Sequence, residues 1–426
     1  MTSDRRDFLK TGLAGSTLLA SGLVHAAGPD TLKVALIGCG GRGTGAAVNA
    51  LRADENVKLV AMADMFADRL ESSLRSLQNE ADIAKKIDVK NEMKFIGFDA
   101  YKRVMETDVD VVLLTAPPGF RPQHLEAAIN ANKHVFCEKP MATDAPGVRR
   151  VMEICKKAKE KGRAVVSGFC YRYQRLKREW TKLIHDGAIG DLVSLHCIYH
   201  AGALWHRPRQ KDWDDMTAQL RNWPYYTWLS GDHIVEQAIH SIDKMSWVMQ
   251  DEPPVKAVGL GGRQSRTGPE FGHIFDHHSV VYEYKNGVKL FHSCRQQAGT
   301  KQEVSDFVYG TAGSASILNQ EIHKIVGKKP FQKSARKEIR DNKDDMYQNE
   351  HDELFRAIRS GRLINDGEFM SRSTLLAIMG RMATYTGQEI TWEMAMNSKE
   401  DLFPKELKFG PLPTPPVAKP GITKFI

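Results

Sequence analysis

Residues 32–43 read LKVALIGCGGRG, and this stretch decides how the first half of the chain folds. The run 32–37 is short, apolar and β-branched, which is typical of a buried parallel strand. It leads directly into a G-x-G-x-x-G pattern made by Gly38, Gly40 and Gly43, and an Ala-rich helical stretch follows. Glycines suit this place because the turn is tight and the backbone must approach a pyrophosphate, which the helix N-terminus then binds. The context predicts a dinucleotide site; the alternative is a glycine turn in an α/β domain that binds no nucleotide.

The next predicted strand, residues 57–63, leads into Asp64, about 20 residues beyond the glycine loop. A carboxylate at this place can accept hydrogen bonds from the adenosine ribose hydroxyls and would repel a 2′-phosphate. NAD is therefore the expected cofactor, and the nearby Arg69 leaves NADP open.

Two more strand–helix units follow in the first half of the chain. Residues 109–115 form an almost unbroken apolar strand, and a helix is expected behind it. The short strand 133–137 then leads into Glu138-Lys139-Pro140, with Pro140 expected at the first position of the next helix. Alternating strands and helices predict a doubly wound parallel sheet, and ligands bind such sheets at the carboxyl ends of the strands.

In the second half, strand-like runs accumulate without helices between them. Asn286-Gly287 separates two of these runs and is a strong signal for a two-residue hairpin. The predicted strands are residues 191–201, 255–263, 278–284, 288–296 and 304–310. The fold class expected is therefore α/β plus α+β: an N-terminal Rossmann domain, then a domain with a largely antiparallel open sheet of about five to seven strands.

The last hundred residues carry three further signals. Residues 321–345 are basic and polar, so we expect a solvated loop, with a contact to an acidic substrate or another subunit as the sharper alternative. Helices are predicted at 348–360 and 371–386. The tail 410–426 holds five prolines and should be extended, either wrapped around a neighbouring subunit or frayed.

The composition narrows the class of protein. At 426 residues, 42% hydrophobic and 26% charged, with a mean hydropathy of −0.41, the chain is a globular protein of two or three domains. The 60 Lys and Arg against 52 Asp and Glu give a net charge of +8, which is too mild to predict nucleic-acid binding. Six scattered cysteines form no CxxC pair, which excludes a disulfide framework and a zinc module.

The N-terminus carries a targeting signal. Arg5-Arg6 are followed by Phe-Leu-Lys, an uncharged run and a small-residue cleavage site, so residues 1–27 resemble a twin-arginine (Tat) signal peptide. We therefore expect export of the folded protein to the periplasm or another extracytoplasmic place, with a bound cofactor carried along. The apolar run is too short to span a bilayer, so no membrane span is expected after signal removal. An uncleaved amphipathic tail is the alternative.

Residues 231–247 contain three ionisable side chains at helical spacing. Glu236, His240 and Asp243 stand at i, i+4 and i+7, and an unbroken helix would align them on one face. Oxidation of a secondary alcohol needs a base for the hydroxyl proton while hydride leaves the same carbon, and histidine suits that task. A carboxylate one turn away can orient the ring, and a lysine can stabilise the developing alkoxide. A salt-bridged amphipathic helix is the alternative interpretation.

The glycine loop, Asp64, His124, Glu138-Lys139-Pro140 and the helix around residue 240 resemble the glucose-fructose oxidoreductase/inositol dehydrogenase (Gfo/Idh/MocA) family. The resemblance covers roughly residues 31–395, and the Glu-Lys-Pro motif is its most diagnostic part. It implies a catalytic set of Lys139, Glu236 and His240. Many sugar dehydrogenases of this family have Asp where this chain has Glu236, and the longer side chain changes its reach.

Other predicted site residues follow from the motifs and the resemblance. The cofactor is expected to contact the loop and the strand ends: Gly38, Gly40, Gly41, Arg42, Gly43, Asp64, Thr115, Pro117, His124, Glu138 and Lys139. The candidates for substrate contact are Tyr171, Arg172, Trp205, Arg207 and Asp243. No metal site is expected, because the spacing of the histidines His196, His200, His273, His277 and His278 matches no standard motif.

The expected organisation is a signal at 1–27, a Rossmann NAD(P)-binding domain at 31–168, an α+β substrate and oligomerisation domain at 169–395, and a Pro-rich tail at 396–426. The expected function is hydride transfer between a secondary hydroxyl of a sugar, polyol or glycoside and a tightly bound nicotinamide cofactor. The alternatives are a redox-neutral, NAD-dependent glycosidase and a non-catalytic NAD-bound sugar-binding protein. A homo-oligomer, dimer or tetramer, is expected, and the sequence does not identify the sugar.

Overall fold

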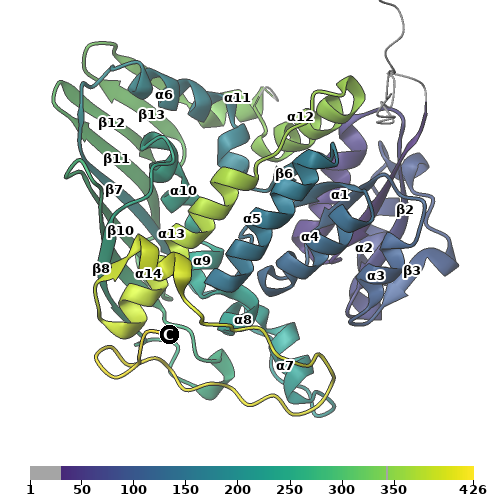
Figure 1. The fold of residues 1–426 in the computed structure, drawn as a ribbon. Helices are drawn as coiled ribbons and strands as arrows, with labels where there is room; N and C mark the ends of the chain where they lie inside the picture. The colour runs from purple at the N-terminus through teal and green to yellow at the C-terminus, as the bar shows by residue number, and fades with distance from the viewer. Residues whose placement is uncertain (1–29, 342–343) are drawn as a thin grey trace, which may run out of the picture.

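The computed structural model describes residues 30–341 and 344–426, and it contains two sheets (Figure 1). The signal expected at 1–27 lies outside the described residues. The first sheet has six strands in the order β3-β2-β1-β4-β5-β6, all parallel. Its strands are β1 (Leu32–Ile37), β2 (Val57–Asp64), β3 (Lys94–Ile96), β4 (Val111–Leu114), β5 (His134–Cys137) and β6 (Val165–Ser167).

Helices cover both faces of this sheet, which explains why its central strands are apolar throughout. On one face lie α1 (Gly41–Ala53), α2 (Ala67–Gln78) and α12 (Met346–Ser360), and on the other lie α4 (Arg121–Asn130) and α5 (Ala145–Glu160). The short helix α3 (Ala100–Met105) packs beside β2 and β3. This doubly wound sheet confirms the fold class expected for the first half.

The second sheet has nine strands in the order β14-β13-β12-β11-β7-β10-β9-β8-β15. Its neighbours are antiparallel except for the β7–β10 pair. The strands are β7 (Leu192–Ala201), β8 (Lys256–Gly262), β9 (His277–Glu283), β10 (Lys289–Gln296), β11 (Glu303–Gly310), β12 (Gly313–Leu318), β13 (Ile322–Val326), β14 (Phe331–Ser334) and β15 (Ile390–Thr391). A hairpin joins β9 to β10 at Asn286-Gly287, as predicted, with Gly287 at φ +82°. Its loop has three residues, 285–287, rather than two, because the Tyr284 N–H donates to the Val288 carbonyl at 2.9 Å.

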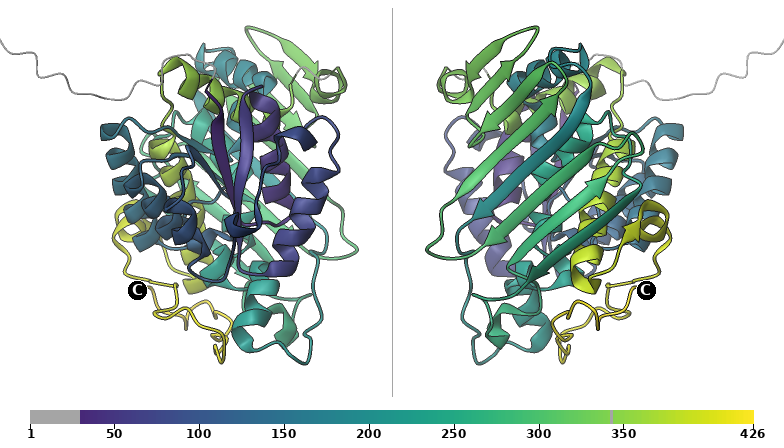
Figure 2. Two further views of the ribbon diagram at one scale, coloured as in Figure 1. Left: turned by 90° about the vertical axis from the view of Figure 1, so that its right-hand side faces the viewer. Right: turned by 90° about the vertical axis from the view of Figure 1, so that its left-hand side faces the viewer.

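One face of the second sheet packs on helices and the other stands open in the right-hand view of Figure 2. The long helix α13 (Gly367–Thr386) lies between the halves, because it packs on α5 of the first half and on β8 of the second. The other helices of the second half are α6 (Arg175–His185), α7 (Asp215–Arg221), α8 (Thr227–Ser230), α9 (His233–Glu236), α10 (Ile239–Val248), α11 (Ala335–Arg340) and α14 (Trp392–Asn397). Among the described residues no helix is long and apolar enough to cross a membrane.

Four other local expectations were wrong. The segment 321–345 is not a solvated loop, because β13, β14 and α11 occupy most of it and Ile325 is buried in the core. The sheet therefore has nine strands rather than five to seven. Pro140 follows a cis peptide bond and does not start a helix, since α5 begins at Ala145. The helix expected over 231–247 is broken, as described below.

The Pro-rich tail is extended, as predicted, but it neither frays nor leaves the body of its own chain. Its end returns to α13 and to the segment after α14, where the Gly421 N–H donates to the Thr386 carbonyl (2.8 Å) and the Lys399 N–H donates to the Ile426 carbonyl (3.2 Å). Figure 1 shows the tail running beneath α14, α8 and α7. The tail thus covers the same end of the molecule as the segment that carries α7.

Candidate functional site

The glycine loop is built for a close backbone approach. Gly38 has φ +100°, and a Cβ there would lie 2.4 Å from the Ala116 amide nitrogen. A Cβ on Gly43 would lie 2.0 Å from the Gly38 carbonyl oxygen. By contrast, a Cβ on Gly40 or Gly41 would meet nothing within 4 Å. The first two glycines therefore fold the loop, and the other two keep it open toward the cavity.

The helix α1 begins at Gly41 with Gly40 as its N-cap, and no side chain caps it. Its first N–H groups therefore remain available to an anion, which the positive end of the helix dipole also favours. Thr115 closes the loop from the end of β4, because its hydroxyl donates to the Gly38 carbonyl at 2.6 Å. The glycine loop and Thr115, both predicted to contact the cofactor, are thus in direct contact with each other.

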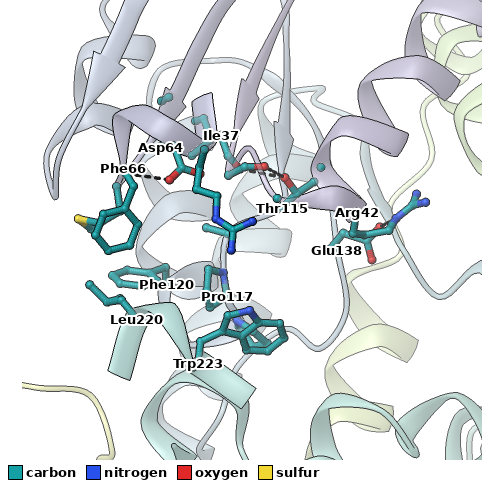
Figure 3. Close-up of a pocket in the computed structure, with 18 of the residues that line it drawn as sticks. Ile37, Arg42, Asp64, Phe66, Thr115, Pro117, Phe120, Glu138, Leu220 and Trp223 are labelled. Carbon is teal, nitrogen blue, oxygen red and sulfur yellow. Dashed lines mark hydrogen bonds and ion pairs between the residues drawn. The ribbon is translucent and has the colours of Figure 1, made fainter. Parts of the chain in front are cut away.

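A cavity of about 450 Å³ opens in front of the loop (Figure 3). Its walls come from the carboxyl ends of β1, β2 and β4, from the Glu138-Lys139 step and from segments of the second half. All predicted cofactor contacts line it: Gly38, Gly40, Gly41, Arg42, Gly43, Asp64, Thr115, Pro117, His124, Glu138 and Lys139. A cradle of exposed backbone N–H groups and open glycines fits the diphosphate of a dinucleotide.

Asp64 is fixed at the end of β2. One carboxylate oxygen accepts from the Cys39 N–H (2.6 Å) and the other from the Phe66 N–H (2.9 Å). Burial raises the pKa of this carboxyl group above its usual range. A carboxylate keeps further lone pairs after two such bonds, so Asp64 can still accept from ribose hydroxyls. Arg69 lines the same part of the cavity, which keeps both NAD and NADP compatible with the site.

Arg42 and Glu138 form an ion pair, as Figure 3 shows. Arg42 also lies 3.4 Å from Glu350 and stacks over the Tyr347 ring at 4.4 Å, and both partners belong to α12. Glu350 is fully buried, and this burial raises its pKa well above the usual range. No sequence signal linked α12 to the glycine loop, because more than three hundred residues separate Arg42 from Glu350.

Lys139 and Glu236 meet across the boundary between the two halves. The Lys139 ammonium donates to Glu236 Oε1 at 2.9 Å and also to the Glu236 main-chain carbonyl. Both side chains line the cavity next to the glycine loop. Two residues of the predicted catalytic set are therefore in direct contact.

The expected role of Glu236 in orienting His240 is wrong. Glu236 binds Lys139 instead, and the helix that was expected to run from Glu236 to His240 is broken. The helix α9 ends at Glu236, and α10 begins only at Ile239. The buried Nδ1 of His240 has no hydrogen-bond partner among the described residues, and its ring lies 4.8 Å from that of Tyr171. Burial and nearby cations, Lys139 first, lower the pKa of His240 well below its ordinary value. The imidazole is therefore neutral at neutral pH.

Arg172 and Asp243, both predicted to contact the substrate, form a buried ion pair outside the cavity lining. Their side chains are 9% and 1% exposed and pair with each other at 2.8 Å. Arg172 also binds Asp251 at 2.6 Å, and Asp243 accepts from the Ser373 hydroxyl at 2.6 Å. Neither side chain lines the cavity, because the break after α9 turns Asp243 into the core.

The other predicted substrate contacts fall near the site. Trp205 and Arg207 line the cavity. Tyr171 is buried against His240, and neither of these two side chains lines the cavity. His124 lines the cavity and stacks on Tyr101 at 4.3 Å, and burial lowers its pKa to about 3. A neutral His124 acts as an aromatic wall of the cavity.

Sequence reasoning missed several lining residues of the second half. Leu220, Arg221 and Trp223 line the cavity although they lie more than 170 residues beyond the glycine loop in the chain. The segment has no strand or helix pattern that points to a nucleotide, so the sequence held no usable signal.

Elsewhere, one buried cluster brings three side chains of metal-binding types together. Asp232, His233 and His278 offer ligand atoms within 4.8 Å of one another. The Asp232 carboxylate already accepts from the Phe275 N–H (2.9 Å), from the His233 N–H and from the Tyr385 hydroxyl. Donors of the protein itself thus satisfy the Asp232 carboxylate. The three side chains form a hydrogen-bonded cluster at the start of α9.

Comparison with known proteins identifies both halves. Residues 32–169 match the oxidoreductase family with an NAD-binding Rossmann fold of the Gfo/Idh/MocA group, and residues 178–316 match a Gfo/Idh/MocA C-terminal domain. An inositol 2-dehydrogenase of Saccharopolyspora erythraea is 29% identical over 265 residues, which is 61% of this chain and 65% of the relative. An inositol 2-dehydrogenase of Salmonella typhimurium is 29% identical over 261 residues, 61% of this chain and 66% of the relative. The match thus spans about two thirds of the length of these relatives.

Solved structures share the fold at low sequence identity. An aldose-aldose oxidoreductase from Caulobacter crescentus, in complex with glycerol, superposes with a TM-score of 0.66 at 18% identity, over 85% of this chain and 99% of its own. An oxidoreductase domain protein from Kribbella flavida gives a TM-score of 0.68 at 16% identity, over 85% and 99% of the two chains. The two family models together cover more than half of the sequence, and this chain belongs to the Gfo/Idh/MocA oxidoreductase family.

Proposed function

We propose that this protein transfers hydride between a secondary hydroxyl of a sugar, polyol or glycoside and a nicotinamide cofactor that stays bound between turnovers. The observation that carries the proposal is the Lys139–Glu236 pair, which lies beside the glycine loop in one cavity. A bound dinucleotide would supply the hydride acceptor or donor. The loop amides, Asp64 and the neighbouring strand ends would hold it.

The chain's own residues provide the proton and charge chemistry. The Lys139 ammonium favours the alkoxide form of a substrate hydroxyl that lies next to it. Glu236 holds Lys139 in place through the 2.9 Å ion pair. His240 is neutral and has an unpartnered, buried Nδ1, so it can accept the hydroxyl proton or pass it on.

The names of relatives support the substrate class. Curated relatives are inositol 2-dehydrogenases, and one structural neighbour is an aldose-aldose oxidoreductase. The aromatic and guanidinium groups of Trp205 and Arg207 at the cavity wall suit a polyhydroxylated ring, because aromatic faces pack on sugar rings and Arg donates several hydrogen bonds. We expect a cyclic polyol or a pyranose rather than an open-chain acid.

The function is tested by cofactor analysis and by paired variants. Denatured, filtered protein should release nicotinamide nucleotide, and a sugar and polyol panel should change its absorbance at 340 nm. Lys139→Ala and His240→Ala should each lower turnover at least about 100-fold while sparing dinucleotide binding. Lys156→Ala, on the exposed face of α5, is the matched control and should keep full activity. Full activity in both site variants would contradict the site assignment.

Product analysis separates the proposed reaction from its closest alternative. Free sugars should yield ketones or lactones, whereas a redox-neutral glycosidase would release the aglycone from a glycoside with no net oxidation. The intact Glu138-Lys139-Pro140 motif supports ordinary oxidoreduction. Release of an aglycone with no carbonyl product would replace the proposal with the glycosidase.

We further propose export by the twin-arginine route and assembly into a homo-oligomer. Arg5-Arg6 and the apolar run support export, and replacing both arginines with lysine should retain the protein in the cytoplasm. The open face of the second sheet supports assembly, because it exposes large apolar side chains: Val193, Val258, Leu260, Phe291, Tyr309 and Val326. Light scattering should find a dimer or tetramer, and Leu260→Glu with Phe291→Glu should shift it toward the monomer.

A further inference from the structure

The segment 202–223 of the second half forms one wall of the dinucleotide cavity. It leaves the sheet after β7, and its side chains Trp205, Arg207, Leu220 and Arg221 face the cavity together with the glycine loop and the end of β2. In Figure 3 Leu220 and Trp223 lie across the cavity from Asp64. The second half therefore closes the cavity on the side of the predicted adenosine site.

Arg221 ties this segment to the Rossmann half. Its two terminal nitrogens each lie 2.7 Å from an oxygen of Asp68 in the first turn of α2, which makes the pair bidentate. The guanidinium also stacks over the Phe66 ring at 3.8 Å. Only 14% of the Arg221 side chain is exposed, whereas 62% of the Asp68 side chain is exposed. The pair is the link between the two walls at this end of the cavity.

The rest of the segment is anchored to its own half. The Met216 N–H donates to the Gly410 carbonyl at 3.1 Å, and the Gln219 side chain donates to the Leu412 carbonyl at 2.7 Å. Met216 and Leu220 are buried in an apolar cluster with Trp228 and with Phe120 of the Rossmann half, and Phe66 packs against this cluster. The segment is therefore held by hydrogen bonds to the tail and by apolar packing, and the Asp68–Arg221 pair adds the ionic contact to α2.

Two arginines face each other at this end of the cavity, Arg69 on α2 and Arg207 on the segment 202–223. Arg69 and Arg207 line the cavity, and among residues 30–341 and 344–426 neither forms an ion pair. Burial, with repulsion from Arg69 and Arg221, lowers the pKa of Arg207. An anionic ligand in the cavity would relieve this repulsion, and a dinucleotide brings a doubly charged diphosphate.

We propose that residues 202–223 act as a clasp and that the Asp68–Arg221 pair holds this clasp closed over the bound dinucleotide, so that the cofactor leaves slowly. This inference rests on the proposed function, since it needs a dinucleotide in the cavity. By linkage, closure of the clasp strengthens dinucleotide binding by the same free energy by which the dinucleotide stabilises the closed clasp. The effect falls mainly on the dissociation rate, because the clasp must open before the cofactor leaves.

The test measures dissociation of NADH from the full-length protein. Protein loaded with NADH is mixed with excess NAD⁺, and the decay of NADH fluorescence gives the off-rate. Asp68→Asn should raise this rate about threefold and Asp68→Arg about tenfold, the latter because it places a cation against Arg221. Asp68 is exposed, so these variants should keep the wild-type melting temperature. The double variant Asp68→Arg with Arg221→Asp should bring the off-rate back toward the wild-type value.

The control is an exposed pair of the same type away from the cavity, Glu126 with Arg150, between α4 and α5. Glu126→Arg should leave the off-rate unchanged. An off-rate in Asp68→Arg within twofold of wild type, or a charge swap that restores nothing, overturns the clasp. Wild-type protein that binds neither NADH nor NADPH overturns the proposed function instead, so the two failures are distinguishable.

Discussion

At the scale of single residues, the glycines of the loop divide into two kinds. Gly38 and Gly43 are required by contacts inside the protein, because a side chain would collide with backbone atoms at 2.4 Å and 2.0 Å. A Cβ on Gly40 or Gly41 would have no neighbouring atom within 4 Å, so contacts inside the protein do not require glycine at these two positions. The motif G-x-G-x-x-G thus mixes folding and binding requirements, and substitution can separate them.

We expect Gly43→Ala and Gly41→Ala to fail in different ways. Gly43→Ala should lower the free energy of unfolding by about 2 kcal/mol or more, since its Cβ overlaps the Gly38 carbonyl. Gly41→Ala should change stability by less than about 0.5 kcal/mol but reduce dinucleotide affinity at least about tenfold, because the methyl group enters the open cradle. Urea unfolding and calorimetric titration with NAD measure the two effects. Equal loss of stability in both variants would contradict this division.

The environment of His240 predicts the pH dependence of alcohol oxidation. Its pKa is held well below the ordinary histidine value, so the imidazole stays neutral as the pH falls through 6.5. If His240 accepts the substrate proton, kcat/KM should stay level from pH 8 to below 6.5 and decline only at lower pH. A pH–rate profile with a sugar substrate checks this, with His240→Gln as the comparison. A decline of kcat/KM that begins at or above pH 6.5 would exclude His240 as a base of low pKa.

At the scale of elements, the break between α9 and α10 decides which predicted residues reach the site. Asp232 precedes α9 with φ +78°, a conformation that non-glycine residues rarely adopt, and its carboxylate is held by several donors. The helix α9 ends at Glu236, and α10 begins at Ile239. Glu236 consequently faces Lys139, whereas Asp243 faces Arg172 in the core. Helical spacing alone would have kept both on one face.

This change of role for Asp243 is testable. Asp243→Asn removes a buried charge that faces Arg172, so we expect a loss of about 2–4 kcal/mol in the free energy of unfolding, moderated by Asp251. KM for the substrate should change less than about threefold, because Asp243 does not line the cavity. Thermal unfolding and steady-state kinetics of the variant provide the two numbers. A stable variant with a greatly raised KM would restore Asp243 to the substrate site.

At the scale of the whole molecule, buried histidines govern acid stability. Burial lowers the pKa of His124, His292 and His323 to about 3 and that of His233 and His273 to about 4, and it holds the pKa of His240 and His351 well below the ordinary value. Between pH 6.5 and about 4 the unfolded chain binds these protons and the folded protein does not, so the free energy of unfolding falls as the pH falls. Buried carboxyl groups with raised pKa values act in the opposite direction, among them Asp366, whose pKa burial raises to about 6, and Glu350.

We therefore expect the melting temperature to decrease steadily from pH 7 to pH 5, with net proton uptake on unfolding at pH 5.5. Each neutral buried histidine contributes up to about 1.4 kcal/mol per pH unit in this window. Calorimetry in two buffers of different ionisation enthalpy measures the uptake. His323→Gln should reduce the uptake by about one proton if it folds normally. A melting temperature that is constant or rises over this range would contradict the assignment.

Local sterics and hydrophobic periodicity made several features of the fold predictable before the structure was known. A strand, a glycine loop and a helix in this order are compatible with few folds. At Gly38 and Gly43 any larger residue would collide with backbone atoms. The ends of the parallel strands then place Asp64 and Glu138-Lys139 at one edge, as predicted. The hairpin at Asn286-Gly287 was likewise readable, since its turn requires a positive φ.

Contacts between residues that lie far apart in the chain could not be predicted in this way. Lys139 binds Glu236 across 97 residues of sequence, Arg42 approaches Glu350 across 308, and Arg221 binds Asp68 across 153. Such pairs depend on how the two halves pack and on where α10 begins. The periodicity of hydrophobic residues along the chain contains neither piece of information. Packing against Arg172 took Asp243 out of the site, and packing against α2 brought residues 202–223 into it.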